Sequence, residues 1–199
     1  LDPQGRADIM HILDELQQHG TTIILVTHHR DEFVNADRII RLDNGRIVQS
    51  ARGNTASIPE MDESGTAQED NPIAKSNIAN GASKPTSAVP IIEIHNLIYQ
   101  YPNSSKPVLD KLSITINEGE TVAITGHNGA GKTTLARLLC ALEQPQSGSI
   151  TVNTIPVARQ RANGNMQSLK RADREKLRAT IGYVMQHPER QLFAETVAE

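Results

Sequence analysis

The chain has 199 residues, enough for one complete domain or for parts of two. It is 37% hydrophobic and 22% charged with a formal net charge of -3, so it reads as an ordinary globular protein without a basic field to attract nucleic acid. No run approaches the roughly 18 apolar residues needed to span a bilayer, and there is no signal peptide, so we expect membrane contact only through a partner. Cys140 is the single cysteine, which rules out an intrachain disulfide and favours a reducing compartment.

Residues 1–50 open with an amphipathic helix. Ile9, Ile12, Leu13 and Leu16 recur at helical spacing, and Gly20 is a stop signal. The β-branched run at 21–27 is typical of a strand in a parallel sheet that is covered on both faces. Residues 38–42 and 46–48 flank an Asp-Asn-Gly turn, which predicts a hairpin. We read the first residue, Leu1, as a sign that the beginning is missing.

Residues 51–90 change to Ser, Thr, Ala, Asn, Gly and Pro, and no apolar periodicity survives there. Such a segment cannot bury enough surface to offset its ordering entropy, so we expect a disordered, flexible linker. An alternative interpretation is a docking site for a basic partner, made by acidic residues of the linker: Glu60, Asp62, Glu63, Glu69 and Asp70.

Residues 91–199 resume a pattern of strands and helices. Strands are predicted at 91–94, 112–116, 121–125, 149–152 and 181–185, and Leu135, Leu138, Leu139 and Leu142 indicate a helix after the third of them. We expect this segment alone to leave its central parallel sheet short of strands, with the apolar faces of the existing strands uncovered.

A complete phosphate-binding loop of the form G-x-x-x-x-G-K-[ST] lies between the strand at 121–125 and the following helix. Its glycines permit a backbone whose N–H groups point into one concavity, and the helix N-terminus adds partial positive charge. Lys132 is expected to reach the β and γ phosphates, and the Thr133 hydroxyl to ligate Mg²⁺. The predicted nucleotide-binding residues of the loop are Gly126, His127, Asn128, Gly129, Ala130, Gly131, Lys132, Thr133 and Thr134.

Three further side chains have readings that sequence alone leaves open. Tyr101 either stacks on a nucleotide base or packs as a strand tyrosine. Gln186 offers an amide oxygen for Mg²⁺ or for a water beside the γ phosphate. His28 ends the strand at 21–27 and is either functional or a structural strand-end histidine.

Together and in this order, the motifs resemble the ATP-binding subunits of ABC transporters. The resemblance makes Tyr101 the A-loop aromatic, residues 126–134 the Walker A motif and Gln186 the Q-loop glutamine. It makes Asp2, in Leu-Asp-Pro, the D-loop residue beside the nucleotide, and it makes His28 the switch histidine that contacts the γ phosphate. It implies catalytic roles for His28 and Gln186, with ATP and Mg²⁺ as cofactors.

A finer resemblance is to the energy-coupling-factor group, which includes cobalt, nickel and vitamin importers. It rests on the sequence Gly-His-Asn-Gly at 126–129 and on the stretch from Gln186 to Val197. The resemblance covers about 1–50 and 91–199. It implies an α/β fold of the P-loop NTPase (ABC ATPase) type, as two incomplete domains joined by the linker: 1–50 as the C-terminal part of a first ATPase domain and 91–199 as the N-terminal part of a second.

The implied function of the parent protein is ATP hydrolysis that powers import of a metal ion or vitamin. The expected partners are integral membrane transporter subunits, with the two ATPase halves pairing at the cytoplasmic face of the membrane and no nucleic acid bound. No L-S-G-G-Q signature occurs in the chain, so these residues alone are expected to bind nucleotide at most. One alternative is a soluble tandem ABC ATPase that remodels ribosomes or nucleic-acid complexes, and another is a small-molecule kinase.

Overall fold

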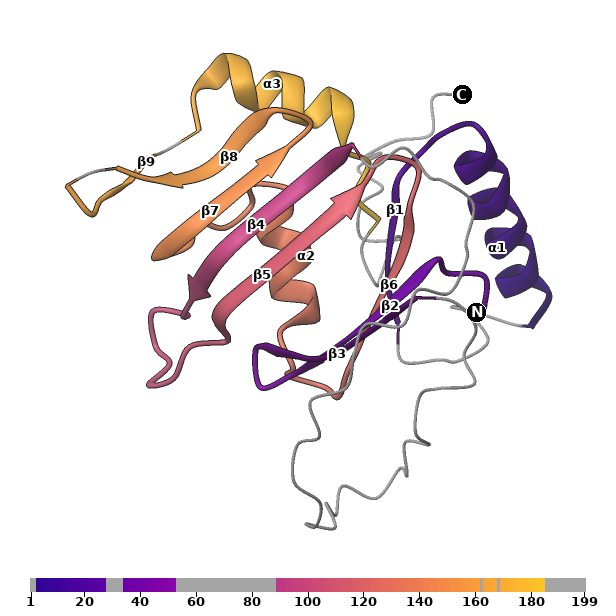
Figure 1. Cartoon of the computed structure of the whole chain (residues 1–199), viewed down its shortest axis with the longest axis horizontal. Coiled ribbons are helices and arrows are strands. Elements are labelled where there is room, and N and C mark those ends of the chain that lie inside the picture. The colour runs from indigo at the N-terminus through magenta and orange to yellow at the C-terminus, as the bar shows by residue number, and fades with distance from the viewer. Residues whose placement is uncertain (1–2, 28–33, 53–88, 162, 168, 185–199) are drawn as a thin grey trace, which may run out of the picture. The chain divides into compact units, whose positions relative to one another are not determined.

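The computed structural model describes residues 3–27, 34–52, 89–161, 163–167 and 169–184. Figure 1 shows three helices and nine strands in this part of the chain. In chain order they are α1 (Pro3–Gln18), β1 (Ile23–Val26), β2 (Arg38–Asp43), β3 (Arg46–Arg52), β4 (Pro90–Tyr99), β5 (Leu109–Asn117), β6 (Thr121–Thr125), α2 (Lys132–Leu139), β7 (Ser147–Val152), β8 (Ile155–Gln160), β9 (Met166–Gln167) and α3 (Arg171–Thr180).

The chain forms two compact units, and the first draws its residues from 1–42, 47–89 and 117–127. Its sheet has the strand order β1-β6-β2-β3. The central strand, β6, pairs in parallel with β1, with Ile24 opposite Val122, and in parallel with β2, with Ile40 opposite Ile124. The sequence predicts that residues 91–199 alone leave their central sheet short of strands. In the structure, residues 1–50 supply a strand on each side of β6.

A buried ion pair holds β2 to the start of β6. Arg38 Nε lies 2.9 Å from Glu120 Oε1, and the two side chains are only 15% and 6% exposed. The other carboxylate oxygen of Glu120 accepts a hydrogen bond from the Asn117 backbone N–H at 2.9 Å. Burial lowers the pKa of Arg38, and the charge of Glu120 opposes that shift. Each charge in such a pair depends on the other to offset its desolvation.

The predicted hairpin is confirmed as β2 and β3, which lie side by side in the first sheet. Its two turn residues, Asn44 and Gly45, both have positive φ, at 46° and 76°. That combination is the one a two-residue turn needs to match the right-handed twist of its strands, and Asn-Gly adopts it readily. The tip of the hairpin, residues 43–46, belongs to the second unit.

The second unit comprises residues 43–46, 90–116 and 128–199. Its sheet has the order β5-β4-β7-β8-β9, and the pairs β4–β7, β7–β8 and β8–β9 are antiparallel. A two-residue turn at Asn153 and Thr154, again with positive φ at both, joins β7 to β8. Helix α3 packs along β8 (Figure 1), and Leu177 is its one buried residue.

Most predicted elements are confirmed, including the strands that correspond to β4, β5, β6 and β7 and the helix that corresponds to α2. The strand predicted at 181–185 is wrong over its described residues. Residues 181–184 form no strand, and Val184 is 78% exposed. An apolar run becomes a buried strand only where another strand supplies backbone hydrogen bonds, and no described strand pairs with these residues. Of the predicted linker at 51–90, residues 53–88 lie outside the described residues. Its ends are corrected, because 51–52 belong to β3 and Pro90 begins β4.

Helix α1 is confirmed, but its predicted apolar face is only partly covered in the described chain. Ile9, Ile12 and Leu16 are between 42% and 53% exposed. No helix among the described residues is long and apolar enough to cross a membrane.

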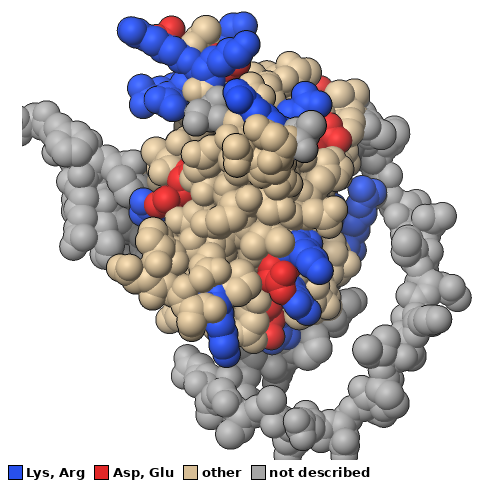
Figure 2. All heavy atoms as spheres, turned by 90° about the vertical axis from the view of Figure 1, so that its left-hand side faces the viewer, with Lys and Arg blue, Asp and Glu red and all other residues tan. Residues whose placement is uncertain are grey.

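Positive charge is concentrated although the chain as a whole carries -3. Figure 2 shows Lys and Arg side chains gathered at the top of one face, where Figure 1 places α3. Helix α3 and the residue before it supply five exposed basic side chains, which are Lys170, Arg171, Arg174, Lys176 and Arg178. Glu175 partly offsets them through an exposed ion pair with Arg171 at 3.1 Å.

Candidate nucleotide-binding site

Strand β6 runs directly into the glycine loop. Four of its five residues are buried, as expected for a strand covered on both faces. Gly126, Gly129 and Gly131 have φ values of 144°, 87° and 101°, a region that residues with a Cβ rarely adopt. Gly131 is the N-cap of α2, where no side chain caps the first turn. The N–H groups of such a helix start point along the helix axis and favour an anion.

Gly131 is also fixed by packing within the second unit. A Cβ at this position would lie 2.7 Å from Leu109 Cδ2 and 2.9 Å from the Val108 carbonyl oxygen. At Gly129, in contrast, a Cβ would meet nothing within 4 Å. One glycine of the loop is thus required by contact as well as by conformation, and the other by conformation alone.

The tip of the β2–β3 hairpin contacts this loop within the second unit. The Gly45 N–H donates a hydrogen bond to the Ala130 carbonyl at 3.2 Å, and the Gly45 carbonyl accepts one from the Asp110 N–H at 3.1 Å. Arg46 completes the contact through an ion pair with the Asp110 carboxylate. The Ala130 carbonyl is held from outside the loop, which fixes the orientation of the peptide that follows it.

Lys132, the first residue of α2, is partly buried, and this burial lowers the pKa of its ammonium group. A cation in such a place gains from an anionic ligand, because the ligand replaces lost hydration with direct charge pairing. Thr133 is exposed at the same helix start, whereas Thr134 is 5% exposed and packs inward. His127 and Asn128 are exposed.

Tyr101 lies just beyond the end of β4. Its hydroxyl is 3.1 Å from Thr134 Oγ1, and its ring packs edge-on against Tyr99 with centroids 5.0 Å apart. The side chain is 38% exposed. An aromatic side chain that keeps this much exposed surface, beside the first turn of α2, can receive a planar ligand.

The structure does not describe three of the predicted site residues. Asp2, His28 and Gln186 lie outside the described residues, so their roles stay predictions. Over the described chain, no group of three or more His, Cys, Asp or Glu is placed to hold a metal ion. A Mg²⁺ ion brought by a triphosphate needs no such cluster, because phosphate and water oxygens fill most of its coordination sphere.

Sequence reasoning missed the residues that support the loop and Tyr101. The Asp-Asn-Gly turn predicted the hairpin but not its contact with Ala130, which depends on the tertiary fold. Glu143 and Gln146 contact the segment that carries Tyr101, and nothing in their sequence context indicated this.

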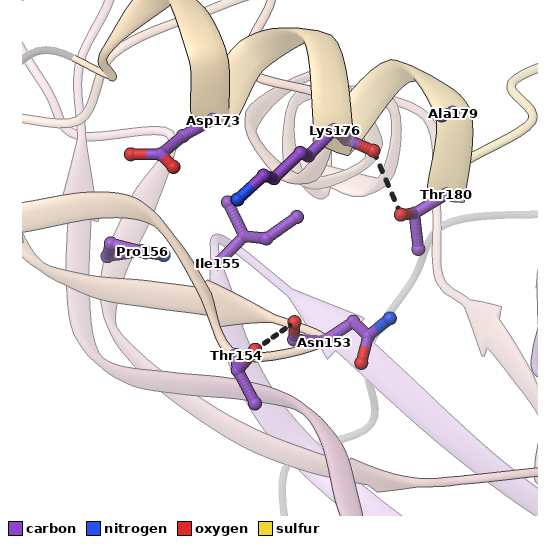
Figure 3. A pocket seen from close by; sticks show the side chains of 8 residues that line it. All are labelled: Asn153, Thr154, Ile155, Pro156, Asp173, Lys176, Ala179 and Thr180. Carbon is purple, nitrogen blue, oxygen red and sulfur yellow. Dashed lines mark hydrogen bonds between the residues drawn. The ribbon is translucent and has the colours of Figure 1, made fainter.

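A separate hollow of about 460 Å³ lies between the β7–β8 turn and α3 (Figure 3). Asp173 and Lys176 from α3 line it, opposite Asn153 and Thr154 of the turn. It shares no residue with the glycine loop or with Tyr101, so it is distinct from the candidate nucleotide site.

Comparisons with known proteins show that the sequence is similar to ABC transporter proteins. Residues 109–199 match the family model described as ABC transporter. The chain is 43% identical over 225 residues to a putative ABC transporter ATP-binding protein of Bifidobacterium longum, covering 100% of this chain and 29% of the relative. It is 39% identical over 109 residues to the energy-coupling factor transporter ATP-binding protein EcfA1 of Latilactobacillus sakei, covering 55% of this chain and 35% of that protein.

Among solved structures, the chain is similar to cbiO1 from Clostridium perfringens, described as part of the ABC transporter complex cbiONQ. The TM-score is 0.44 with 32% identity, over 53% of this chain and 38% of the other. The chain spans well under half the length of these relatives.

The strand–glycine loop–helix arrangement and the family match show the α/β fold of a P-loop protein of the ABC ATPase type. More particularly, residues 109–199 are similar to the ATP-binding domains of ABC transporters. Domains of this class bind ATP.

Proposed function

We propose that this chain binds the triphosphate of ATP at residues 126–134. The observation that carries the proposal is the loop itself: three glycines at positive φ lead into the start of α2, where no side chain caps the helix, and the partly buried Lys132 is the first helical residue. Backbone N–H groups would hold the phosphate oxygens, and Lys132 would neutralise the β and γ phosphates.

Two further roles complete the binding site. The Tyr101 ring would stack on the base, because it is exposed beside the helix whose start holds the phosphates. The Thr133 hydroxyl fits a Mg²⁺ ion, because it is exposed and follows Lys132 directly. Gln186 would supply a second oxygen to that ion. When bound, Mg²⁺ would neutralise charge on the phosphate oxygens.

In the whole protein we propose ATP hydrolysis that drives import of a metal ion or vitamin, with the ATPase at the cytoplasmic face of the membrane. The supports are the similarity to EcfA1 and the text from Gln186 to Val197. Integral membrane subunits would be the partners. His28 would act as switch histidine and Asp2 as D-loop residue of a paired ATPase half.

The two-domain reading of 1–50 and 91–199 is also a proposal, and the first sheet bears on it. Strands β1 and β2, from residues 1–50, flank β6 on both sides. If the two ATPase halves are paralogous, the closing strands of one half have the pattern needed to complete the sheet of the other. Residues 1–50 could then pair with the central strand of their own half or with that of the other half.

The test is calorimetric titration with MgATP of the wild-type chain and of Lys132→Ala. We expect the substitution to weaken binding by about 3 kcal/mol, or more than 100-fold, since charge-assisted hydrogen bonds in a dry site are lost. Lys106→Ala, an exposed lysine of the same unit, is the matched control and should leave the affinity unchanged. Equal ATP affinity in wild type and Lys132→Ala would refute the site.

A further inference from the structure

The segment that follows α2 holds the backbone that leads to Tyr101. We call residues 143–146 the brace. The Gln146 side chain accepts a hydrogen bond from the Gln100 N–H at 2.8 Å and donates one to the Gln100 carbonyl, also at 2.8 Å. The backbone N–H of Gln146 donates to the Ile98 carbonyl at 3.0 Å. Both backbone polar groups of Gln100, the residue before Tyr101, are therefore hydrogen-bonded to one side chain.

The brace also holds the ring on which Tyr101 rests. Tyr99 is 3% exposed, and its hydroxyl donates a hydrogen bond to Glu143 Oε2 at 2.9 Å. Arg137, in α2, donates to the other carboxylate oxygen at 2.9 Å, so the carboxylate is fixed from both sides. The Tyr99 ring meets Tyr101 at an interplanar angle of 87°, an edge-to-face contact that is favourable between aromatic rings.

Helix α2 connects the two ends of this arrangement. It begins at Lys132 in the phosphate loop, and the brace follows shortly after its last residue, Leu139. Tyr101 is linked to the same helix directly, because its hydroxyl is hydrogen-bonded to Thr134 in the first turn. The separation between the ring of Tyr101 and the start of α2 is thus set by one short helix and its brace.

We propose that the brace is a positioning element that holds Tyr101 at a fixed distance from the phosphate loop, so that one ligand must present a planar base and a triphosphate together. The inference rests on the proposed nucleotide site and deepens it. Glu143, Gln146 and Tyr99 are positioning residues in this account, since they act through Tyr101.

The inference separates two parts of the ligand. Inorganic tripolyphosphate offers only the phosphate chain, which the glycine loop and Lys132 hold. ATP adds the base, which only Tyr101 would hold. Loosening the brace should therefore weaken ATP binding and leave tripolyphosphate binding unchanged, whereas a general loss of structure would weaken both.

The experiment titrates the full chain with ATP and with tripolyphosphate, each with Mg²⁺, in wild type, Tyr99→Phe and Gln146→Ala. Tyr99→Phe removes one hydroxyl and keeps the ring, so it tests the brace even if Gln146→Ala folds poorly. We expect each variant to lose about three- to tenfold in ATP affinity, the size of one or two neutral hydrogen bonds, with tripolyphosphate affinity unchanged within about twofold. Gln160→Ala, which removes a side-chain hydrogen bond to the Gly164 carbonyl in the same unit, is the control and should change neither affinity.

The same titrations on Tyr101→Ala and on Tyr99→Phe/Tyr101→Ala show whether the brace acts through Tyr101. We expect Tyr99→Phe to have no further effect on ATP affinity once Tyr101 is gone. Additive losses, or equal losses for ATP and tripolyphosphate, would overturn the inference. So would an unchanged ATP affinity in Tyr99→Phe and Gln146→Ala while Tyr101→Ala weakens it, and the proposed site would then stand. If Lys132→Ala alters neither ligand, the proposed nucleotide site itself fails.

Discussion

The two sheets of this chain differ in how far apart their partners lie in the sequence. In the first, β6 is flanked by β1 and β2, which precede the 53–88 segment, whereas β6 follows it. In the second, β4–β5, β7–β8 and β8–β9 join sequence neighbours, and β4–β7 is the one pair of distant strands among the described residues. Distant partners need specific contacts to offset the entropy of closing a long loop. The comparison teaches that the first sheet should depend on a few buried contacts and the second mainly on local turns.

The largest effect is expected at the buried ion pair of the first sheet. Glu120→Ala removes the carboxylate that offsets the burial of the Arg38 charge, so it should lower the free energy of unfolding by about 3 to 5 kcal/mol in urea titrations. The control is Asp110→Ala in the second unit, whose partner Arg46 is 68% exposed, and about 1 kcal/mol or less is expected there. Similar losses in both variants would remove the distinction between the sheets.

Gly20 and Gly45 separate the cost of backbone strain from the cost of a steric clash, because both have positive φ but only Gly45 is in close contact. Gly45→Ala places a Cβ 2.2 Å from the Val108 carbonyl oxygen, a backbone atom that cannot rotate away. Gly20→Ala meets nothing within 4 Å, although Gly20 also has positive φ. We expect roughly 1 to 2 kcal/mol for Gly20→Ala from backbone strain alone, and at least about 1 kcal/mol more for Gly45→Ala. Thermal unfolding measures both, and equal costs would mean that the hairpin tip does not pack on Val108.

The pKa of Lys132 gives the nucleotide site its own pH dependence. Burial lowers this pKa, so the ammonium that attracts phosphate is lost at lower pH than for an ordinary lysine at 10.5. Affinity for tripolyphosphate should be highest below the lowered pKa and fall up to about tenfold per pH unit above it. Calorimetry between pH 7 and pH 10 checks this. The same series on Lys132→Ala should be flat, and a parallel decline in both proteins would assign the effect to another group.

The raised pKa of Tyr99 predicts that the second unit loses stability at alkaline pH. Burial, with the hydrogen bond to Glu143, raises this pKa from 10.0 to about 12. Because the folded state favours the neutral phenol, its stabilising contribution is present below pH 10 and is lost as the pH rises toward 12. Urea unfolding at several pH values should show a smaller alkaline loss of stability for Tyr99→Phe than for wild type. Identical losses in both proteins would show that ionisation of Tyr99 does not cause the alkaline loss of stability.

The smallest effect belongs to the exposed ion pair of α3. Arg171 and Glu175 are 94% and 65% exposed, and they lie one helical turn apart. Arg171→Ala should change the free energy of unfolding by about 0.5 kcal/mol or less, and added salt should reduce even that. A loss above about 1 kcal/mol would mean that α3 depends on its surface charges more than on Leu177.

The sequence predicted the local features of this molecule and missed those that depend on distant contacts. The strand at 121–125 and the loop that follows it could be read because β-branched residues, glycines and helical leucines stand next to one another. The Asn44-Gly45 turn was equally local. The pairing of β6 with β1 and β2 was missed, because an apolar run does not specify its partners. Residues 181–184 were misread for the same reason.

At the candidate site, too, the sequence predicted the local features and missed the contacts between distant residues. The glycines and Lys132 form one contiguous motif, so the sequence was sufficient to locate them. Tyr101 was proposed from its type and position. The brace was not predictable, because the contact between Gln146 and Gln100 exists only once α2 returns the chain to the end of β4.

The central claim is that the backbone of residues 126–134 holds a triphosphate, and amide hydrogen exchange with and without MgATP tests it most directly. Exchange at Gly129 to Thr133 should slow in the wild-type chain when MgATP is added, because these N–H groups would donate to phosphate oxygens. Lys132→Ala should show no such slowing at the same nucleotide concentration. The result that would contradict the account is bound ATP, verified by calorimetry, with unchanged exchange throughout the loop.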